Sequence, residues 1–411
     1  MYTTVFYLIV LIIVIEFLWD RFLLYLNTTM WSDKLPSELQ DVYDEEKYAK
    51  QQQYSKVNHK FGWLTTIYSL ALILLMLFFN GFAWLNSWTT QVSDNSIIQA
   101  ILFLGVLGLG STVLNMPFSL YSTFVIEEKF GFNKTTPKTF VLDFIKSLLI
   151  GALLGGGILA LIVWFYEAAG ENFWLYAWGF MTVFMLFITM FYTSVLLPLF
   201  NKQTPLEDGE LKVAIEEFSE KVNFKLDNIY IMDGSKRSTK ANAFFSGLGA
   251  KKRIVLYDTL VNDLEVDEIV GVLAHEIGHY KKKHTLWGML SGIVQTGIML
   301  YVFSLFVDSP VLSQALGVQK PVFHIGLIAF GILYSPISGV SGLFSTLLSR
   351  KNEYEADAFA ATNHNSSSLI KALKTISVNA LSNLTPHPWF VFFHYSHPPL
   401  LARINALKKY S

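Results

Sequence analysis

The sequence predicts a membrane α-helical protein that also carries a small α+β unit. Hydrophobic residues make up 52% and charged residues only 15% of the 411 residues, whereas soluble domains carry about 25% charged residues. Six segments contain no Asp, Glu, Lys or Arg, and each is long enough to cross a bilayer as a helix, which needs about 20 residues. These segments are residues 61–93, 95–126, 147–166, 172–201, 285–307 and 321–349.

A seventh span is predicted at residues 4–26, although Glu16, Asp20 and Arg21 interrupt it. A cleaved signal peptide is the alternative, but no basic residue precedes the apolar run and no small-x-small cleavage site follows it. Ionisable side chains in a span are expected to face protein or water instead of lipid. Within the fourth span, the Gly155-Gly156-Gly157 triplet is typical of close helix packing.

The Lys and Arg distribution predicts the orientation. Lys residues are frequent in segments 27–60, 127–146 and 201–285 and absent from the connections near 86–96 and 167–171. Because cytosolic loops carry an excess of basic residues, we expect the N-terminus outside and the C-terminus in the cytosol. The chain is therefore divided into spans 1–5 and their loops, a cytosolic segment, spans 6–7 and a C-terminal cytosolic segment, at residues 1–200, 201–285, 286–349 and 350–411.

The segment before the sixth span reads as an α+β unit. The pattern predicts a helix over residues 210–222, strands near 229–233, 243–247 and 253–257, and a second helix from about Glu265. The last two strands are expected to be antiparallel, joined by a Gly-containing turn. An antiparallel strand beside a helix offers an edge to which an extended peptide can add by main-chain hydrogen bonds.

The second helix carries the motif His275-Glu276-x-x-His279. Positions i and i+4 share one helix face, so both imidazoles can bind one metal ion while Glu276 stands beside a metal-bound water. The alternative is an amphipathic helix with two solvent-facing histidines. The apolar neighbours Leu273 and Ile277 argue against it, and Gly278 is small enough for close packing. The absence of Cys leaves His and carboxylates as ligands.

A hydrolytic zinc site needs a third protein ligand on another element. Glu353 and Asp357 share one face of a predicted helix, so Glu353 could bind the metal while Asp357 orients a ligand His. From spacing alone, Glu355 and His364 remain possible ligands, and an ordinary acidic helix end is the alternative to all of them.

Two further polar residues follow near the C-terminus. A His in the run His394-Tyr395-Ser396-His397-Pro398-Pro399 could stabilise an oxyanion. Arg403 could bind a carboxylate or support the acidic residues. A structural role is equally compatible with the sequence for both, and His364, His387 and His394 receive no assigned function.

In these motifs the chain resembles the type I CAAX prenyl proteases, which are integral-membrane gluzincins. The resemblance covers nearly the whole length. It rests on the zinc helix, on the C-terminal His-Pro-Pro run and on the segments 126–133, 233–238, 242–245 and 353–360. One departure is Lys240, which replaces the His often found two residues before the family's Asn.

The resemblance implies a fold in which seven transmembrane helices enclose a chamber, capped by a cytosolic gluzincin-like α+β zinc metalloprotease domain. It implies one Zn²⁺ per chain and a set of site residues: ligands His275, His279 and Glu353, general base Glu276, oxyanion stabiliser His397, supporting residues Asp357 and Arg403, and the substrate-backbone strand Asn242, Ala243 and Phe244.

The predicted function is a membrane zinc endopeptidase acting on peptide or protein substrates. The resemblance implies that it cuts near the C-terminus of its substrate, after a prenylated Cys in a C-a-a-X tail. The first alternative is a quality-control protease for non-prenylated proteins, and the second is a transporter with a structural metal site. We expect a monomer in contact with membrane lipid and no nucleic-acid partner, because no basic stripe with interleaved aromatics occurs. A bacterial inner membrane is the expected location, with the endoplasmic reticulum as the alternative.

Overall fold

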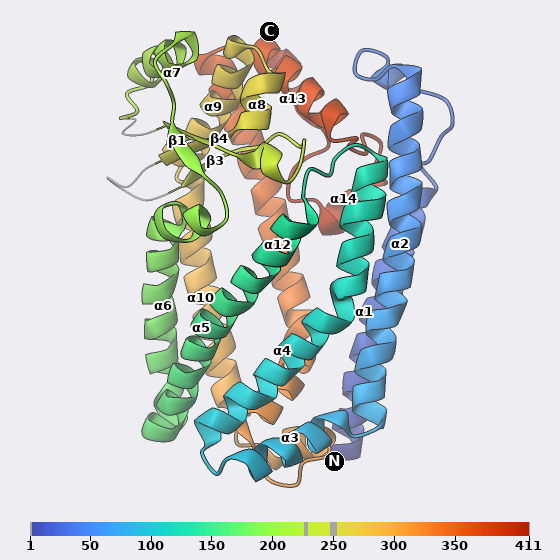
Figure 1. Ribbon diagram of the computed structural model, residues 1–411, viewed down its shortest axis with the longest axis vertical. Coiled ribbons are helices and arrows are strands. Elements are labelled where there is room, and N and C mark those ends of the chain that lie inside the picture. The colour runs from blue at the N-terminus through green and yellow to red at the C-terminus, as the bar shows by residue number, and fades with distance from the viewer. Residues whose placement is uncertain (1, 226–228, 247–252, 411) are drawn as a thin grey trace.

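The computed structural model describes residues 2–225, 229–246 and 253–410. Long helices run side by side through most of the molecule, and a small sheet with short helices sits at one end of them (Figure 1). The N-terminus lies at the opposite end from the C-terminus (Figure 1). The predicted fold class, a helical membrane protein with an attached α+β unit, is therefore confirmed.

The long helices match the apolar segments of the sequence. Among the described residues, six helical stretches are long and apolar enough to cross a membrane, and one of them, Pro137–Leu199, contains two helices separated by a turn at Gly170–Asn172. The number of seven crossings stays a prediction. The long helices are α1 (Tyr2–Thr28), α2 (Glu45–Phe78), α4 (Ser96–Tyr121), α5 (Pro137–Ala169), α6 (Phe173–Phe191), α10 (His284–Ser304) and α12 (Phe323–Asn363).

The second predicted span was wrong in its extent. The charge-free run 61–93 breaks at Asn80, which has a left-handed backbone (φ 54°), and a separate helix α3 (Gly81–Val92) follows. Helix α3 lies across the end of the long helices (Figure 1). Phe82 and Leu85 of α3 are buried in the apolar core between these helices. Hydropathy alone does not distinguish one long membrane span from a shorter span followed by a short apolar helix that packs against the ends of the long helices.

The expectation of close packing at the glycine triplet was also wrong. A Cβ added at Gly155, Gly156 or Gly157 would meet no atom of the described residues within 4 Å. Gly155 and Gly156 instead line an apolar cavity of about 530 Å³ between α4 and α5. The ionisable residues of α1 do have protein partners, as expected: Glu16 accepts a hydrogen bond from Ser335, and Asp20 pairs with Arg21.

The described sheet has four strands in the order β1-β2-β4-β3. Strands β2 (Ile229–Met232), β3 (Ala243–Ser246) and β4 (Arg253–Tyr257) match the predicted strands, and β1 (Gln203–Pro205) was not predicted. β3 pairs with β4 antiparallel and forms one edge of this sheet, while β2 and β4 are parallel. The turn predicted between β3 and β4 lies outside the described residues.

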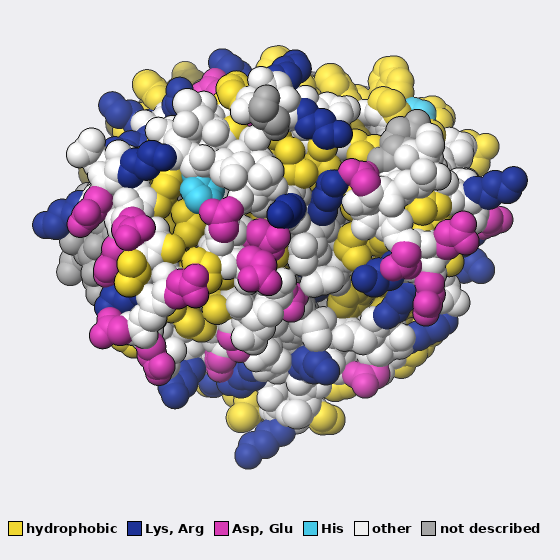
Figure 2. All heavy atoms as spheres, turned by 90° about the horizontal axis from the view of Figure 1, so that it is seen from above, with side chains coloured by type: hydrophobic (Ala, Val, Ile, Leu, Met, Phe, Trp, Pro, Cys, Tyr) yellow, Lys and Arg dark blue, Asp and Glu magenta, His cyan; other side chains and the backbone are white. Residues whose placement is uncertain are grey.

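The shorter helices at this end of the molecule are α7 (Glu210–Lys221), α8 (Asp258–Asp263), α9 (Val266–Lys281), α13 (Ser366–Asn379), α14 (Pro388–His394) and α15 (Leu400–Leu407). A further short helix, α11 (Pro310–Ala315), packs against α1 and α12. Viewed along the long axis onto the sheet-bearing end, the surface carries Lys, Arg, Asp and Glu side chains of both signs side by side (Figure 2). This end of the molecule is therefore suited to water.

Candidate metal centre and active site

Helix α9 is the element on which the site is built. It begins with a capping box, in which Glu265 and Glu268 satisfy each other's backbone N–H groups. Its apolar face is fully buried: Ile269, Leu273 and Ile277 are 0 or 1% exposed and belong to a core shared with the sheet and α7. The helix is thereby fixed in rotation, and His275 and His279 project together from one face.

Gly278 sets how closely α12 approaches α9. A Cβ at this position would lie 3.1 Å from both the Cα and the carbonyl oxygen of Ala356. The close packing expected for Gly278 is therefore confirmed. Because α12 is a single helix of 41 residues, it delivers Glu353 to this contact from the end of a membrane-embedded segment.

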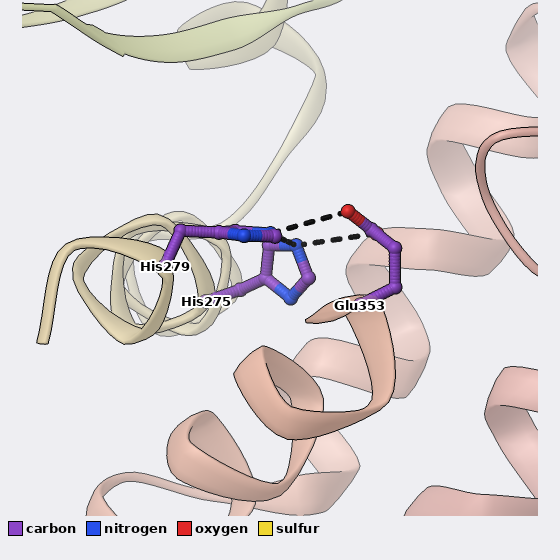
Figure 3. A group of neighbouring side chains, drawn as sticks. All are labelled: His275, His279 and Glu353. Atoms are coloured by element: carbon purple, nitrogen blue, oxygen red, sulfur yellow. Dashed lines mark hydrogen bonds and ion pairs between the residues drawn. The ribbon is translucent and has the colours of Figure 1, made fainter. Parts of the chain in front are cut away.

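Three side chains converge at the contact (Figure 3). The His275 and His279 Nε2 atoms are 3.1 Å apart. Glu353 places Oε1 3.2 Å from His279 Nε2 and Oε2 3.5 Å from His275 Nε2. The three ligand atoms all lie within 4.8 Å of one another, as expected for residues that share one metal ion.

The chemistry of this set fits a cation. Two imidazole nitrogens face each other, and a buried carboxylate, 3% exposed, completes the group. No described residue donates a hydrogen bond to Glu353 Oε2, although this oxygen is buried. A buried acceptor without a partner is costly, so a positive ion between the three residues would satisfy it. Two nitrogens and one carboxylate are a typical donor set for a catalytic zinc ion.

A buried ionic network holds His275 from behind. Asp357 Oδ1 lies 2.9 Å from His275 Nδ1, and Arg403 donates to both carboxylate oxygens of Asp357 at 2.7 and 2.9 Å. Arg403 Nη1 also lies 3.6 Å from Glu353. Burial lowers the pKa of His275, but the neighbouring carboxylates of Asp357 and Glu353 outweigh this effect and raise it to about 9. The structure thus brings together both predicted supporting residues.

Two further predicted residues lie at the same site. Glu276 is adjacent to His275 on α9; burial raises its pKa, while electrostatic interaction with the neighbouring histidines of the motif opposes the change. His397, between α14 and α15, lies with Nε2 3.4 Å from Glu353 Oε1, and its side chain is 64% exposed. An exposed imidazole beside the ligand cluster can reach a bound substrate.

The predicted substrate strand lies beside the motif helix. β3 packs against α9 and leaves one of its edges free of the other described strands. The Asn242 side chain accepts a hydrogen bond from the Ala243 N–H at 2.9 Å. Phe244 packs on the far side of the sheet, with Leu197, Met232 and Val255. The Phe244 ring is thus taken up by packing within the sheet, and the role of this strand in substrate binding stays a prediction.

The remaining candidates lie elsewhere. His364 pairs with Asp267 at 3.0 Å, and Glu355 contacts His284 at 3.3 Å. Lys240 binds Glu127 at 2.8 Å, which ties the loop before β3 to the membrane helices. His284 was not predicted, although its Nδ1 lies 3.1 Å from His279 Nδ1. The only signal in the sequence was a His five residues after the motif.

Comparison with known proteins identifies the family. The family described as CAAX prenyl protease N-terminal, five membrane helices, matches residues 25–202, and peptidase family M48 matches residues 205–411. This chain belongs to peptidase family M48. The predicted family is confirmed, and the chain is a membrane metalloprotease. This membership contradicts the transporter alternative.

Relatives match over nearly the full length. CAAX prenyl protease 1 of Saccharomyces cerevisiae is 35% identical over 95% of this chain and 92% of that protein. The human CAAX prenyl protease 1 homolog is 31% identical over 95% of this chain and 93% of that protein. The crystal structure of S. mikatae Ste24p superposes with a TM-score of 0.93 at 35% identity, covering 98% of this chain and 99% of that one.

Proposed function

We propose that this chain is a zinc endopeptidase that cleaves peptide bonds near the C-terminus of prenylated CAAX-type substrates at the membrane–cytosol boundary. The observation that carries the proposal is the convergence of His275 and His279 of α9 with Glu353, which lies towards one end of the long helix α12. The names of the full-length relatives, CAAX prenyl protease 1, support the substrate class. One zinc ion per chain is expected.

The site residues have separate tasks in this proposal. A zinc ion bound there would polarise the scissile carbonyl and lower the pKa of water. Glu276 accepts the proton of the attacking water and passes it to the leaving amine. His397 donates a hydrogen bond to the carbonyl oxygen as negative charge develops on it. Asp357 and Arg403 keep His275 in the orientation that presents Nε2 to the metal.

The substrate is proposed to bind as an additional strand. The free edge of β3, beginning after Asn242, offers main-chain hydrogen bonds to an extended peptide. The peptide would then run beside α9, within reach of Glu276 and His397. Main-chain binding of this kind tolerates varied side chains, which suits a protease that recognises mainly the end of its substrate.

The proposed topology places the N-terminus outside and the protease end in the cytosol. The termini at opposite ends of the molecule and the alternation of Lys-rich and Lys-free connections support it (Figure 1). The charged end face (Figure 2) fits exposure to water. A monomeric state and the bacterial inner membrane, with the endoplasmic reticulum as the alternative, remain predictions.

The test uses purified, zinc-loaded protein and two peptides with the same C-a-a-X sequence, one farnesylated at the Cys and one not. Glu276→Gln serves as the blank. Cleavage confined to the farnesylated peptide is the expected result. Equal cleavage of both would make the lipid incidental and favour the quality-control protease. No cleavage of either peptide would overturn the proposed substrate class.

The third ligand is tested separately by metal analysis. Glu353→Ala is expected to lose zinc, because the carboxylate supplies one of the three protein ligands. Full zinc content in this variant would move the third ligand to another residue. Thr362→Ala, exposed near the end of the same helix and hydrogen-bonded to the Ala358 carbonyl, serves as the control.

A further inference from the structure

His284 is the first residue of α10 and lies against the motif helix. Lys283, with a left-handed backbone (φ 60°), turns the chain between α9 and α10 so that His284 folds back onto His279. The Nδ1 atoms of the two rings are 3.1 Å apart, and the rings are nearly perpendicular, at 74°. The His284 side chain is only 9% exposed.

The other nitrogen of His284 faces a carboxylate. Its Nε2 lies 3.3 Å from Glu355 Oε2, and Lys351, one turn earlier on α12, lies 3.7 Å from the second oxygen of Glu355. Glu355 therefore reaches the ligand His279 indirectly: it contacts His284, and His284 contacts His279. Glu355, which its spacing in the sequence left open as a metal ligand, thus contacts His284 instead of the ligand cluster.

The proton positions in the series His279, His284 and Glu355 follow from the nitrogen of His279 that binds the metal. His279 points Nε2 at His275 and Glu353, so Nε2 is the nitrogen available to a metal. The proton of a neutral His279 then sits on Nδ1 and needs an acceptor. His284 Nδ1 is that acceptor, which requires the His284 proton to be on Nε2, where Glu355 accepts it. Every nitrogen in the series therefore has a matched donor or acceptor.

Glu355 and His284 together support the second ligand, His279, as Asp357 alone supports the first ligand, His275. Asp357 contacts Nδ1 of His275 directly at 2.9 Å. Carboxylates that hold the second nitrogen of a ligand His fix the tautomer and ring orientation and raise the basicity of the ligand. Glu355 reaches His279 only through an interposed imidazole, and its side chain is 38% exposed. Its contribution should be smaller than that of the buried Asp357.

We propose that His284, backed by Glu355, is a positioning residue that holds the ring of His279 in the tautomer and orientation needed to bind the metal. The inference rests on the proposed zinc site and adds a support for its second ligand. Helix α12 then supplies both a metal ligand, Glu353, and the carboxylate of Glu355, which holds His284. The sequence motif relevant to metal binding therefore continues beyond His279 and includes His284.

The test measures zinc affinity by competition with a chromophoric chelator and, in parallel, the unfolding temperature of the metal-free full-length protein. His284→Ala should weaken zinc binding about 10- to 100-fold, and Glu355→Gln should weaken it less. The unfolding temperature of the metal-free protein should stay near that of wild type. His284→Asn, whose amide oxygen can replace Nδ1 as acceptor, should recover most of the affinity.

The matched control is His364→Ala. His364 also pairs with a carboxylate, Asp267 at 3.0 Å, and also links the ends of α12 and α9, but it does not contact a ligand. It should leave zinc affinity unchanged. An affinity of His284→Ala within twofold of this control would overturn the inference, as would a failure of His284→Asn to bind better than His284→Ala.

Wild-type zinc binding separates this inference from the function proposed above. A wild type that binds zinc but cleaves neither peptide would overturn the substrate proposal and leave the role of His284 standing. A wild type that binds no zinc would overturn both.

Discussion

Gly278 offers a direct test of how the two ligand-bearing helices are held together. Replacing it by Ala adds one methyl group at the point where α9 and α12 touch. That carbon would lie 3.1 Å from the Cα and the oxygen of Ala356 and 3.2 Å from Cβ of Phe359. The nearest atoms are backbone atoms, which cannot move by changing a rotamer, so the helices must separate by a few tenths of an ångström.

The expected cost follows from two opposing effects. Overpacking a well-packed contact costs about 1–3 kcal/mol, and Ala gains about 1 kcal/mol over Gly in helix propensity. The net change in the free energy of unfolding should therefore be small, up to about 2 kcal/mol of destabilisation. The separation nevertheless exceeds the roughly 0.2 Å tolerance of metal–ligand distances, and Glu353 sits three residues from the contact. Zinc affinity should fall about tenfold, or 1.4 kcal/mol.

The assay is zinc competition on Gly278→Ala together with its thermal unfolding. Gly339→Ala is the control, because a Cβ at Gly339, in the same helix α12, would meet no described atom within 4 Å. Gly339→Ala should leave zinc affinity unchanged. Wild-type affinity in Gly278→Ala would show that the close approach of α9 and α12 does not set the metal geometry, and the reasoning would be refuted.

Three further predictions concern single side chains. Glu276→Gln should abolish cleavage while metal analysis finds zinc near the wild-type level; loss of zinc would make Glu276 structural instead. Asp357→Ala leaves Arg403 buried without its carboxylate, so we expect about 3–5 kcal/mol of destabilisation, seen as earlier thermal unfolding and weaker zinc binding; unfolding at the wild-type temperature would contradict this. Lys240→Met removes the ammonium that lies 2.8 Å from Glu127 and should make the segment before β3 easier to cut in limited proteolysis, with zinc content unchanged; an unaltered cleavage pattern would count against it.

Local patterns were enough for one part of the site. His275 and His279 stand on one helix face because positions i and i+4 always do, and the apolar residues around them predicted which face is buried. The ligand types followed from the absence of Cys. Strand positions were predicted to within about one residue, because β2, β3 and β4 are short runs rich in apolar residues. The three-residue β1 is too short to show such a pattern.

Hydropathy predicted helices but not their breaks or contacts. The run 61–93 carries no charge, yet a single left-handed residue, Asn80, divides it into two helices. In the glycine triplet of α5, Gly155 and Gly156 line a cavity between α5 and α4 and are not in close contact with the neighbouring helix. In both cases the outcome depends on what lies opposite the segment in space, which composition does not contain.

Hydrophobicity and helix periodicity are properties of neighbouring residues, so they were sufficient to predict a membrane protein with a metal-binding helix. Only the tertiary structure decided which acidic residue completes the site. Glu355 lies about 200° around the helix from Glu353, so the packing of α12 on α9 at Gly278 directs Glu353 to the two histidines and Glu355 to His284. The contacts between Glu353 and the two histidines join residues 74 and 78 positions apart in the sequence, and they are made possible by the contact between two helices.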